Sequence, residues 1–335
     1  MTTSLQEAVD RAAVDSGFSG VVRVDRSGST ELARAYGLAD RAHGVPNTVE
    51  TLFATASGAK TLTALAVMRL VERGTLGLGT TARSLLGDDL PLVADDVTVE
   101  HLLAHRSGIG DYFDEDDVAD VRDYVLPVPV HRLTTTADYL PLLDGHRTVS
   151  PAGERFAYNN GGFVLLALIA ERASGEDYYD LVRTLVCEPA GMADTAFLRS
   201  DELPGRAARG YLSVDGLRTN VLHLPVRGTG DGGVYTTAAD VSSLWEALYA
   251  GRVVSPGTLA EMVRPRSDWP EESRRYGLGF HLQATGDGVF LEGSDAGVSF
   301  ASLHWPSTAT TCTVIANWSD GAWPVVRVLS DRLGG

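Results

Sequence analysis

The feature that most constrains the fold is an apolar run that begins at Ser57 and continues to Arg73. This run is apolar on nearly all sides of a helical projection, so it predicts a helix that lies in the middle of the protein. Gly74 is expected to end the helix. A core that surrounds such a helix must be large, and a chain of 335 residues with 44% apolar residues can supply one.

Strand patterns occur near both ends of the chain, and helical patterns fill its middle. The N-terminal part predicts a helix over 4–15 and a hairpin of strands over 20–25 and 31–36, followed by an irregular stretch over 38–56. The middle predicts helices over 98–105, 161–173, 178–187 and 238–250. The C-terminal part predicts strands over 277–282, 289–291, 298–304 and 311–316, and a closing helix over 324–333.

This order predicts the fold class and the domain organisation. We expect an α/β (α+β) protein in which one central antiparallel sheet, built from both termini, is flanked by helices and interrupted by a mostly helical insertion. Residues 1–335 are expected to form a single unit. Its α/β region covers about 1–75 plus 231–335, and its helical region about 76–230.

The charge balance limits the classes of partner. With 28 basic and 44 acidic residues the formal net charge is −16, which argues against binding to nucleic acid or to an anionic membrane. No apolar stretch is long enough to cross a bilayer. The first ten residues lack the basic and apolar segments of a signal peptide, so we expect a cytoplasmic protein. In that compartment Cys187 and Cys312 are expected to be reduced core residues.

The mouth of the long apolar helix carries a pair of reactive residue types. Ser57 and Lys60 stand three positions apart, so a helical backbone places their hydroxyl and amine on one face, one turn apart. Lys60 is the only lysine, and the other 27 basic residues are arginine. Arginine stays charged, whereas a buried lysine can lose its proton and activate a neighbouring nucleophile. The pair therefore indicates a serine nucleophile with a lysine base.

A second candidate group lies a hundred residues later, at Tyr158-Asn159-Asn160. A tyrosine near an ammonium group can relay protons, and an asparagine two residues further on can hold the lysine or a substrate amide. Alone, Tyr-x-Asn is a weak pattern, because a buried tyrosine usually only packs.

Taken together, these motifs resemble those of the class C β-lactamases, their penicillin-binding-protein relatives and the related esterases and D-amino-acid peptidases. The likeness covers about residues 20–320, with the motifs in the family's order. The matching stretches are Phe53–Lys60 with the nucleophile, His101–Gly108 with "LLxHxSG", Phe156–Gly161 with Tyr-x-Asn, Gly232–Asp240 with "GGxxSTxxD" and Tyr276–Phe280 with a late strand.

The resemblance implies a role for each of these residues. Ser57 would be acylated, Lys60 and Tyr158 would share the general-base work, and Asn160 would be a positioning residue. The family's third motif, Lys-Thr-Gly or His-x-Gly, aligns with 291–293. Gly293 would then be the last residue of this motif, on the strand that flanks the pocket, and the backbone N–H of Ser294 would complete the oxyanion hole with that of Ser57.

One position departs from the family pattern. The basic first residue of the third motif is Leu291 here. In β-lactamases and carboxypeptidases this cation helps to hold the substrate carboxylate, and its loss removes a charge-assisted hydrogen bond worth about 1.5–3 kcal/mol. We therefore expect a serine hydrolase that cleaves a small ester or amide. The alternatives are β-lactamase, D-Ala-D-Ala carboxypeptidase or D-aminopeptidase activity, biosynthetic acyl transfer, and a catalytically silent binding protein.

Three other patterns have competing interpretations. Gly228–Gly233 satisfies G-x-G-x-x-G but lacks a surrounding βαβ unit, so we interpret it as a loop near the pocket and predict no cofactor. His101 and His105 have the spacing of zinc ligands, but no third ligand is evident and no metal is predicted. The acidic run over 111–117 is either a solvated loop or a lining that favours cationic substrates. The oligomeric state stays open.

Overall fold

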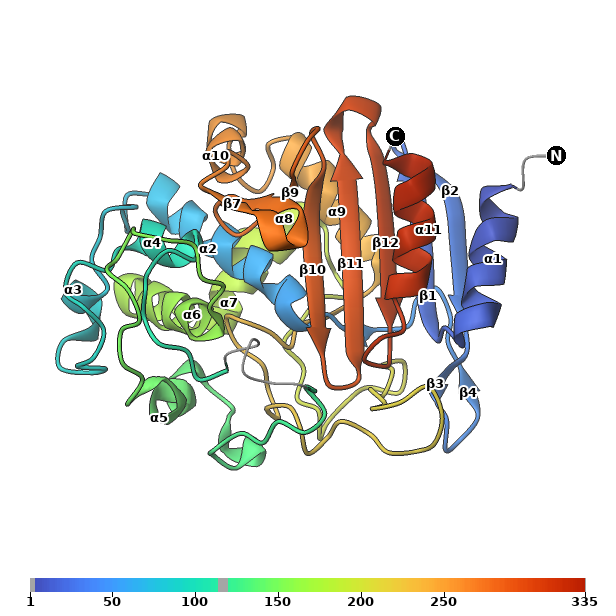
Figure 1. Cartoon of the computed structure of the whole chain (residues 1–335), viewed down its shortest axis with the longest axis horizontal. Helices are drawn as coiled ribbons and strands as arrows, with labels where there is room; N and C mark the ends of the chain where they lie inside the picture. The colour runs from blue at the N-terminus through green and yellow to red at the C-terminus, as the bar shows by residue number, and fades with distance from the viewer. Residues whose placement is uncertain (1–3, 114–119, 335) are drawn as a thin grey trace.

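The structure is a computed structural model that describes residues 4–113 and 120–334. Within these residues, eight strands form one antiparallel sheet in the order β2-β1-β12-β11-β10-β9-β8-β7 (Figure 1). Two short ladders, β3-β4 and β5-β6, lie outside it. The strands are β1 (Gly20–Arg26), β2 (Ser29–Tyr36), β3 (Leu38–Asp40), β4 (Val45–Pro46), β5 (Phe53–Ala54), β6 (Tyr235–Thr236), β7 (Ser267–Trp269), β8 (Arg274–Tyr276), β9 (His281–Gln283), β10 (Val289–Asp295), β11 (Val298–Trp305) and β12 (Thr310–Ala316).

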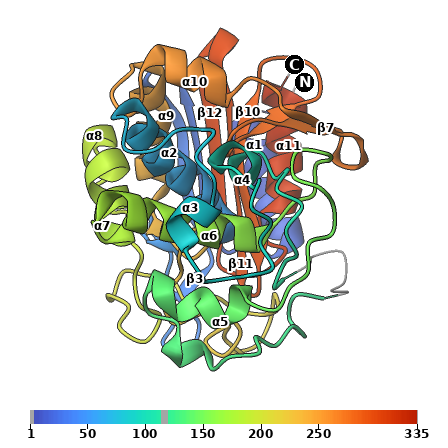
Figure 2. The same cartoon turned by 90° about the vertical axis from the view of Figure 1, so that its left-hand side faces the viewer.

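Helices cover both faces of the sheet. Helices α1 and α11 pack together against one face, close to both chain ends, and the helical middle of the chain lies on the other side (Figures 1 and 2). The helices are α1 (Leu5–Ser16), α2 (Ala59–Glu72), α3 (Arg83–Leu86), α4 (Val99–Leu103), α5 (Leu140–Leu143), α6 (Asn160–Ser174), α7 (Tyr178–Val182), α8 (Glu188–Ala190), α9 (Ala238–Tyr249), α10 (Pro256–Met262) and α11 (Trp323–Leu333). A 3₁₀ turn, η1 (Ala56–Gly58), precedes α2.

The larger hydrophobic cluster lies between the sheet and the helical side, and α2 and α6 form its centre. In α2 every residue from Ala59 to Met68 is buried, and in α6 the same holds from Asn160 to Ala170. A helix that is apolar on all sides is stable only where every side is buried, as at the centre of this cluster. The two helices pack against each other, so residues at their N-terminal ends meet inside the protein.

The predicted fold class is confirmed: the central sheet is antiparallel, comes from both termini and is flanked by helices. Two details differ from the sequence analysis. Residues 38–56 contain the short strands β3, β4 and β5, and the segment predicted as a strand over 277–282 pairs only from His281. Met262 O and Leu103 O accept from the N–H groups of Leu278 and Gly279, so these residues bond to the last residues of α10 and α4 rather than to a strand. The predicted domain boundaries stay a prediction.

Cys187 and Cys312 are buried and unpaired, as predicted. None of the helices within the described ranges combines the length and the apolar character that a bilayer crossing requires. The compartment stays a prediction.

Candidate active site

Ser57 lies in the tight turn η1, between β5 and the first residue of α2. The residue before it, Ala56, has φ 46°, a left-handed conformation that costs free energy for a residue with a Cβ. Such strain is retained where the surrounding structure dictates it, which is common at functional sites. Ser57 itself is half-buried, so its hydroxyl lies within the protein without being closed off from solvent.

Lys60 is almost fully buried, at 3% exposure, and its amine has three acceptors. Its Nζ donates to Ser57 Oγ at 2.8 Å, to Asn160 Oδ1 at 2.7 Å and to the backbone oxygen of Asp231 at 2.9 Å. In its protonated form the amine has three hydrogens, one for each of these acceptors, so the contacts fix its position. The amine thus lies directly beside the hydroxyl, as the one-turn spacing of the two residues predicts.

Asn160 reaches Lys60 because it is the first residue of α6, which packs against α2. The neighbouring residue Asn159 is the N-cap, and its Oδ1 accepts from Gly162 N at 2.6 Å. The carboxylate of Asp111 accepts from the backbone N–H groups of Asn160 and Gly161. Burial raises the pKa of Asp111 to about 6, although these hydrogen bonds and Lys60 oppose the rise.

Tyr158 belongs to a panel of rings on the other side of Lys60. Lys60 Nζ lies 5.0 Å from the centroid of the Tyr158 ring. That ring packs on His105, with centroids 4.4 Å apart, and stacks on Trp269 at 5.9 Å and His281 at 6.3 Å. The panel therefore holds the phenol next to the amine.

The two histidines that pack against Tyr158, His105 and His281, are both buried. Burial, Lys60 and the other imidazole lower the pKa of His105 well below its ordinary value. Burial, Arg274 and Lys60 lower the pKa of His281 to about 3. His105 Nδ1 accepts from Asn159 N at 3.0 Å, which ties the "LLxHxSG" segment to the loop that carries Tyr158. In the described part of the chain no cluster of three or more metal-ligating side chains occurs.

The loop of Asp231 reaches the site through the β5-β6 ladder. Phe53 and Ala54 pair with the strand that directly follows this loop, and Thr55 N donates to Val234 O. The ladder therefore places the segment before the nucleophile beside residues nearly 180 positions later in the chain. Tyr112 Oη donates to Asp231 Oδ2 at 2.5 Å. Burial raises the pKa of both groups, and Lys60 partly offsets the rise at Asp231.

Strand β10 forms the third wall of the site. Gly293 approaches the nucleophile turn so closely that a Cβ there would lie 2.1 Å from Thr55 O and 2.7 Å from Ser57 N. Only glycine permits this contact, which brings the N–H of Ser57 next to the strand. Ser294 follows at an exposed position. Leu291 is 3% exposed and belongs to the core, so its side chain does not reach the open site.

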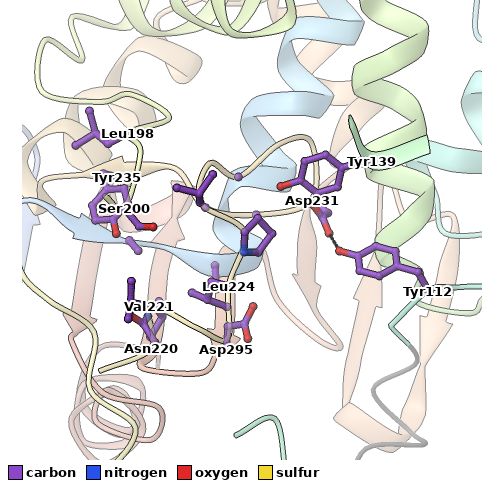
Figure 3. Close-up of a pocket in the computed structure, with 18 residues that line it drawn as sticks. Tyr112, Tyr139, Leu198, Ser200, Asn220, Val221, Leu224, Asp231, Tyr235 and Asp295 are labelled. Atoms are coloured by element: carbon purple, nitrogen blue, oxygen red, sulfur yellow. Dashed lines mark hydrogen bonds between the residues drawn. The ribbon is translucent and has the colours of Figure 1, made fainter. Parts of the chain in front are cut away.

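A cavity of about 80 Å³ opens beside the nucleophile turn. Ala56, Asp231 and Gly232 line it, together with the polar side chains of Tyr235 and Asp295. Figure 3 shows the Tyr112–Asp231 hydrogen bond at one end of this cavity, and Tyr235 with Ser200 at the other. The glycine-rich loop over 228–233 thus lies at the pocket, as predicted.

The structure brings five of the six predicted site residues together: Ser57 in η1, Lys60 on α2, Asn160 on α6, Tyr158 in the loop before α6, and Gly293 on β10. Ser294 follows Gly293 on the same strand, and its role stays a prediction. Sequence reasoning missed Asp231, which holds Lys60 through its backbone oxygen. It left Asp111 open between a solvated loop and a site lining, and the structure places this residue against the first turn of α6. Residues 114–117 of the acidic run lie outside the described residues.

Comparisons with known proteins show what this chain is similar to. The Beta-lactamase family matches residues 5–322. Esterase EstB of Burkholderia gladioli is 32% identical over 320 residues, which cover 84% of this chain and 78% of EstB. Penicillin-binding protein 4* of Bacillus subtilis is 29% identical over 281 residues, which cover 79% of this chain and 60% of that protein.

A solved structure is similar over the whole fold. The penicillin-binding protein from Bacillus halodurans has a TM-score of 0.90 and 34% identity, with 96% of this chain and 99% of that chain covered. The chain spans between 60% and 78% of the length of three curated relatives. From the family match and this likeness, the chain belongs to the Beta-lactamase family.

Proposed function

We propose that this protein is a serine hydrolase that cleaves a small ester or amide through an acyl-enzyme on Ser57. The observation that carries the proposal is the 2.8 Å contact between Ser57 Oγ and Nζ of the buried Lys60. A serine hydroxyl becomes a nucleophile when a positioned base takes its proton. The name of the relative EstB, an esterase, favours the same reaction type.

The chemistry divides into two balanced steps. In the first, Ser57 Oγ attacks the substrate carbonyl while its proton passes to neutral Lys60, with Tyr158 sharing the transfer. The bond to the leaving alcohol or amine then breaks, and that group takes the proton. In the second, water gives a proton to the same base and attacks the acyl group. The bond from the acyl carbon to Ser57 Oγ then breaks, and the base returns its proton to that oxygen, so the acid and free Ser57 are released. No cofactor takes part.

When Ser57 attacks, negative charge develops on the carbonyl oxygen of the substrate, and fixed N–H donors are needed to stabilise it. The N–H groups of Ser57 and Ser294 are proposed to supply them, since Gly293 brings β10 against the nucleophile turn. Losing one such donor typically costs about 10²–10³ in kcat. Asn160 is proposed to position Lys60, because its Oδ1 accepts from the amine at 2.7 Å.

Replacement of the nucleophile tests the proposal. Ser57→Ala should lower turnover of p-nitrophenyl butyrate by at least about 10⁴-fold, because the covalent route is then closed. The matched control is Ser84→Ala, the same change at an exposed serine, which should retain full activity. Retained turnover in folded Ser57→Ala protein would end the proposal.

The second candidate is β-lactamase or D-alanyl peptidase activity. It is favoured by the family and by the two similar penicillin-binding proteins. The burial of Leu291 counts against it, because the strand then offers no cation to a substrate carboxylate. Hydrolysis of nitrocefin at a rate above that of the ester would reverse the order of the two candidates.

A further inference from the structure

An ion pair lies between the strands that border the active site. Arg274 on β8 and Glu292 on β10 approach to 3.0 Å between Nη1 and Oε2, across the short strand β9. Their side chains are 24% and 26% exposed, so both are only partly hydrated. The guanidinium also lies over the ring of Phe290, 5.8 Å from its centroid.

The chain neighbours and strand partners of this pair lie next to the reacting groups. Glu292 directly precedes Gly293, the residue that touches the nucleophile turn. Arg274 is the cross-strand partner of Trp269, whose ring stacks on Tyr158. The positive charge of Arg274 also reaches this region, since Arg274 and Lys60 both contribute to the lowered pKa of His281.

The chemistry of the pair differs from that of a free cation. A guanidinium has five N–H donors and binds a carboxylate well, so a free Arg274 would attract anionic substrates. Glu292 already neutralises it and would repel a second carboxylate. A substrate carboxylate would have to displace Glu292 and leave that side chain unpaired and partly desolvated.

We propose that Glu292 is a specificity-determining residue, which neutralises Arg274 and thereby selects neutral or amine-bearing acyl groups over acyl groups with a carboxylate. The inference rests on the proposed function and goes further by naming the excluded substrate class. At position 291 a leucine stands where the family has a basic residue, so β10 offers no cation there. The cation on β8, Arg274, is paired with Glu292 and is therefore not available to a substrate carboxylate. Discrimination against like charge is a recognised route to specificity.

Three esters of one chain length test this inference: p-nitrophenyl hexanoate, p-nitrophenyl hydrogen adipate and p-nitrophenyl 6-aminohexanoate. Wild-type turnover of the hexanoate reports on the proposed function, and the ratios between the esters report on Glu292. For Glu292→Gln, which keeps the side-chain shape, we expect the adipate-to-hexanoate ratio of kcat/KM to rise about tenfold. The 6-aminohexanoate ratio should fall several-fold.

Three further variants complete the test. Glu272→Gln makes the same charge change at an exposed position in the β7–β8 turn and should leave the ratios unchanged. Arg274→Gln should lower the adipate-to-hexanoate ratio below that of the wild type, and it serves equally if Glu292→Gln does not fold. Adding Arg274→Gln to Glu292→Gln should cancel the gain. Ratios that stay constant in Glu292→Gln and in Arg274→Gln would overturn the inference.

Discussion

The inner and outer halves of the site are built in different ways. The inner half consists of Lys60 and Asn160, which are 3% and 4% exposed and come from two helices in the centre of the core. The outer half consists of Arg274 and Glu292, which come from strands β8 and β10 and keep about a quarter of their side-chain surface. The inner groups are fixed by short hydrogen bonds, whereas the outer ones depend on how β8 and β10 pair with β9 between them.

Because of this difference, we expect changes in the inner half to affect the reaction rate and changes in the outer half to affect the choice of substrate. A change in the inner half alters the position of the amine, so it should slow the reaction of every substrate. A change in the outer half leaves the amine in place, so it should alter the preference between substrates. The predictions below test the inner half, and the ester ratios of the Glu292 variants test the outer half.

The largest effect after loss of the nucleophile is expected from Lys60→Arg. Arginine keeps the positive charge but does not give up its proton, so kcat should fall by about 10³-fold for all three esters. Burst-phase and steady-state rates with each of the three esters measure this loss. Equal losses for neutral and charged esters would support the division between the halves, and losses that depend on substrate charge would break it.

A pair of neighbouring asparagines gives a matched comparison. Asn160→Ala removes an acceptor from Lys60, and the misplaced amine should lower kcat/KM by about 10–100-fold. Asn159→Ala removes the cap of α6 and should mainly lower the free energy of unfolding, by about 1–2 kcal/mol. Rates and urea unfolding curves of the two variants should separate these roles. Equal rate losses in both would contradict the assignment of Asn160.

The smallest expected effect is the pH dependence that Asp111 imposes. Its pKa of about 6 means that the carboxyl takes up a proton as the pH falls below 6 and then loses acceptor capacity toward α6. We expect kcat/KM to fall a few-fold from pH 7 to pH 5, and this fall should be absent in Asp111→Asn. His105 and His281 stay neutral in this range because their pKa values are lowered.

Asp111 also makes the free energy of unfolding depend on pH. Folding raises the pKa of Asp111 above its ordinary value of 3.8, so its ionisation costs stability. The cost is fully present above pH 6 and disappears below about pH 4. An inflection near pH 6 that persists in the rate profile of Asp111→Asn would assign this titration to another group.

Much of the fold and the inner site could be predicted because both follow local patterns. The run after Ser57 is apolar on every side, which dictates a buried helix, and three-residue spacing dictates that Lys60 faces the hydroxyl. The terminal strands alternate or are continuously apolar, and they pair over their whole lengths. Asn160 was predicted from the Tyr-x-Asn motif. It contacts Lys60 because it begins the second apolar helix, α6, which packs against α2.

The rest depends on pairings that no local pattern reveals. Asp231 reaches Lys60 through the two-residue ladder β5-β6, which is too short to leave a pattern in the sequence. Arg274 and Glu292 meet across β9, and this contact depends on the register of the short strands β8 and β9 against β10. The charged residues of β8 give it the appearance of a surface loop. The outer half of the site was therefore the part that the sequence did not predict.

Covalent labelling tests the central claim most directly. The intact protein is treated with a fluorophosphonate, digested, and sequenced by tandem mass spectrometry. We predict a single adduct on Ser57, which is absent in Ser57→Ala and forms about 10³-fold more slowly in Lys60→Arg. An adduct on a different serine, or labelling of Ser57 at the same rate without the lysine amine, would contradict the account.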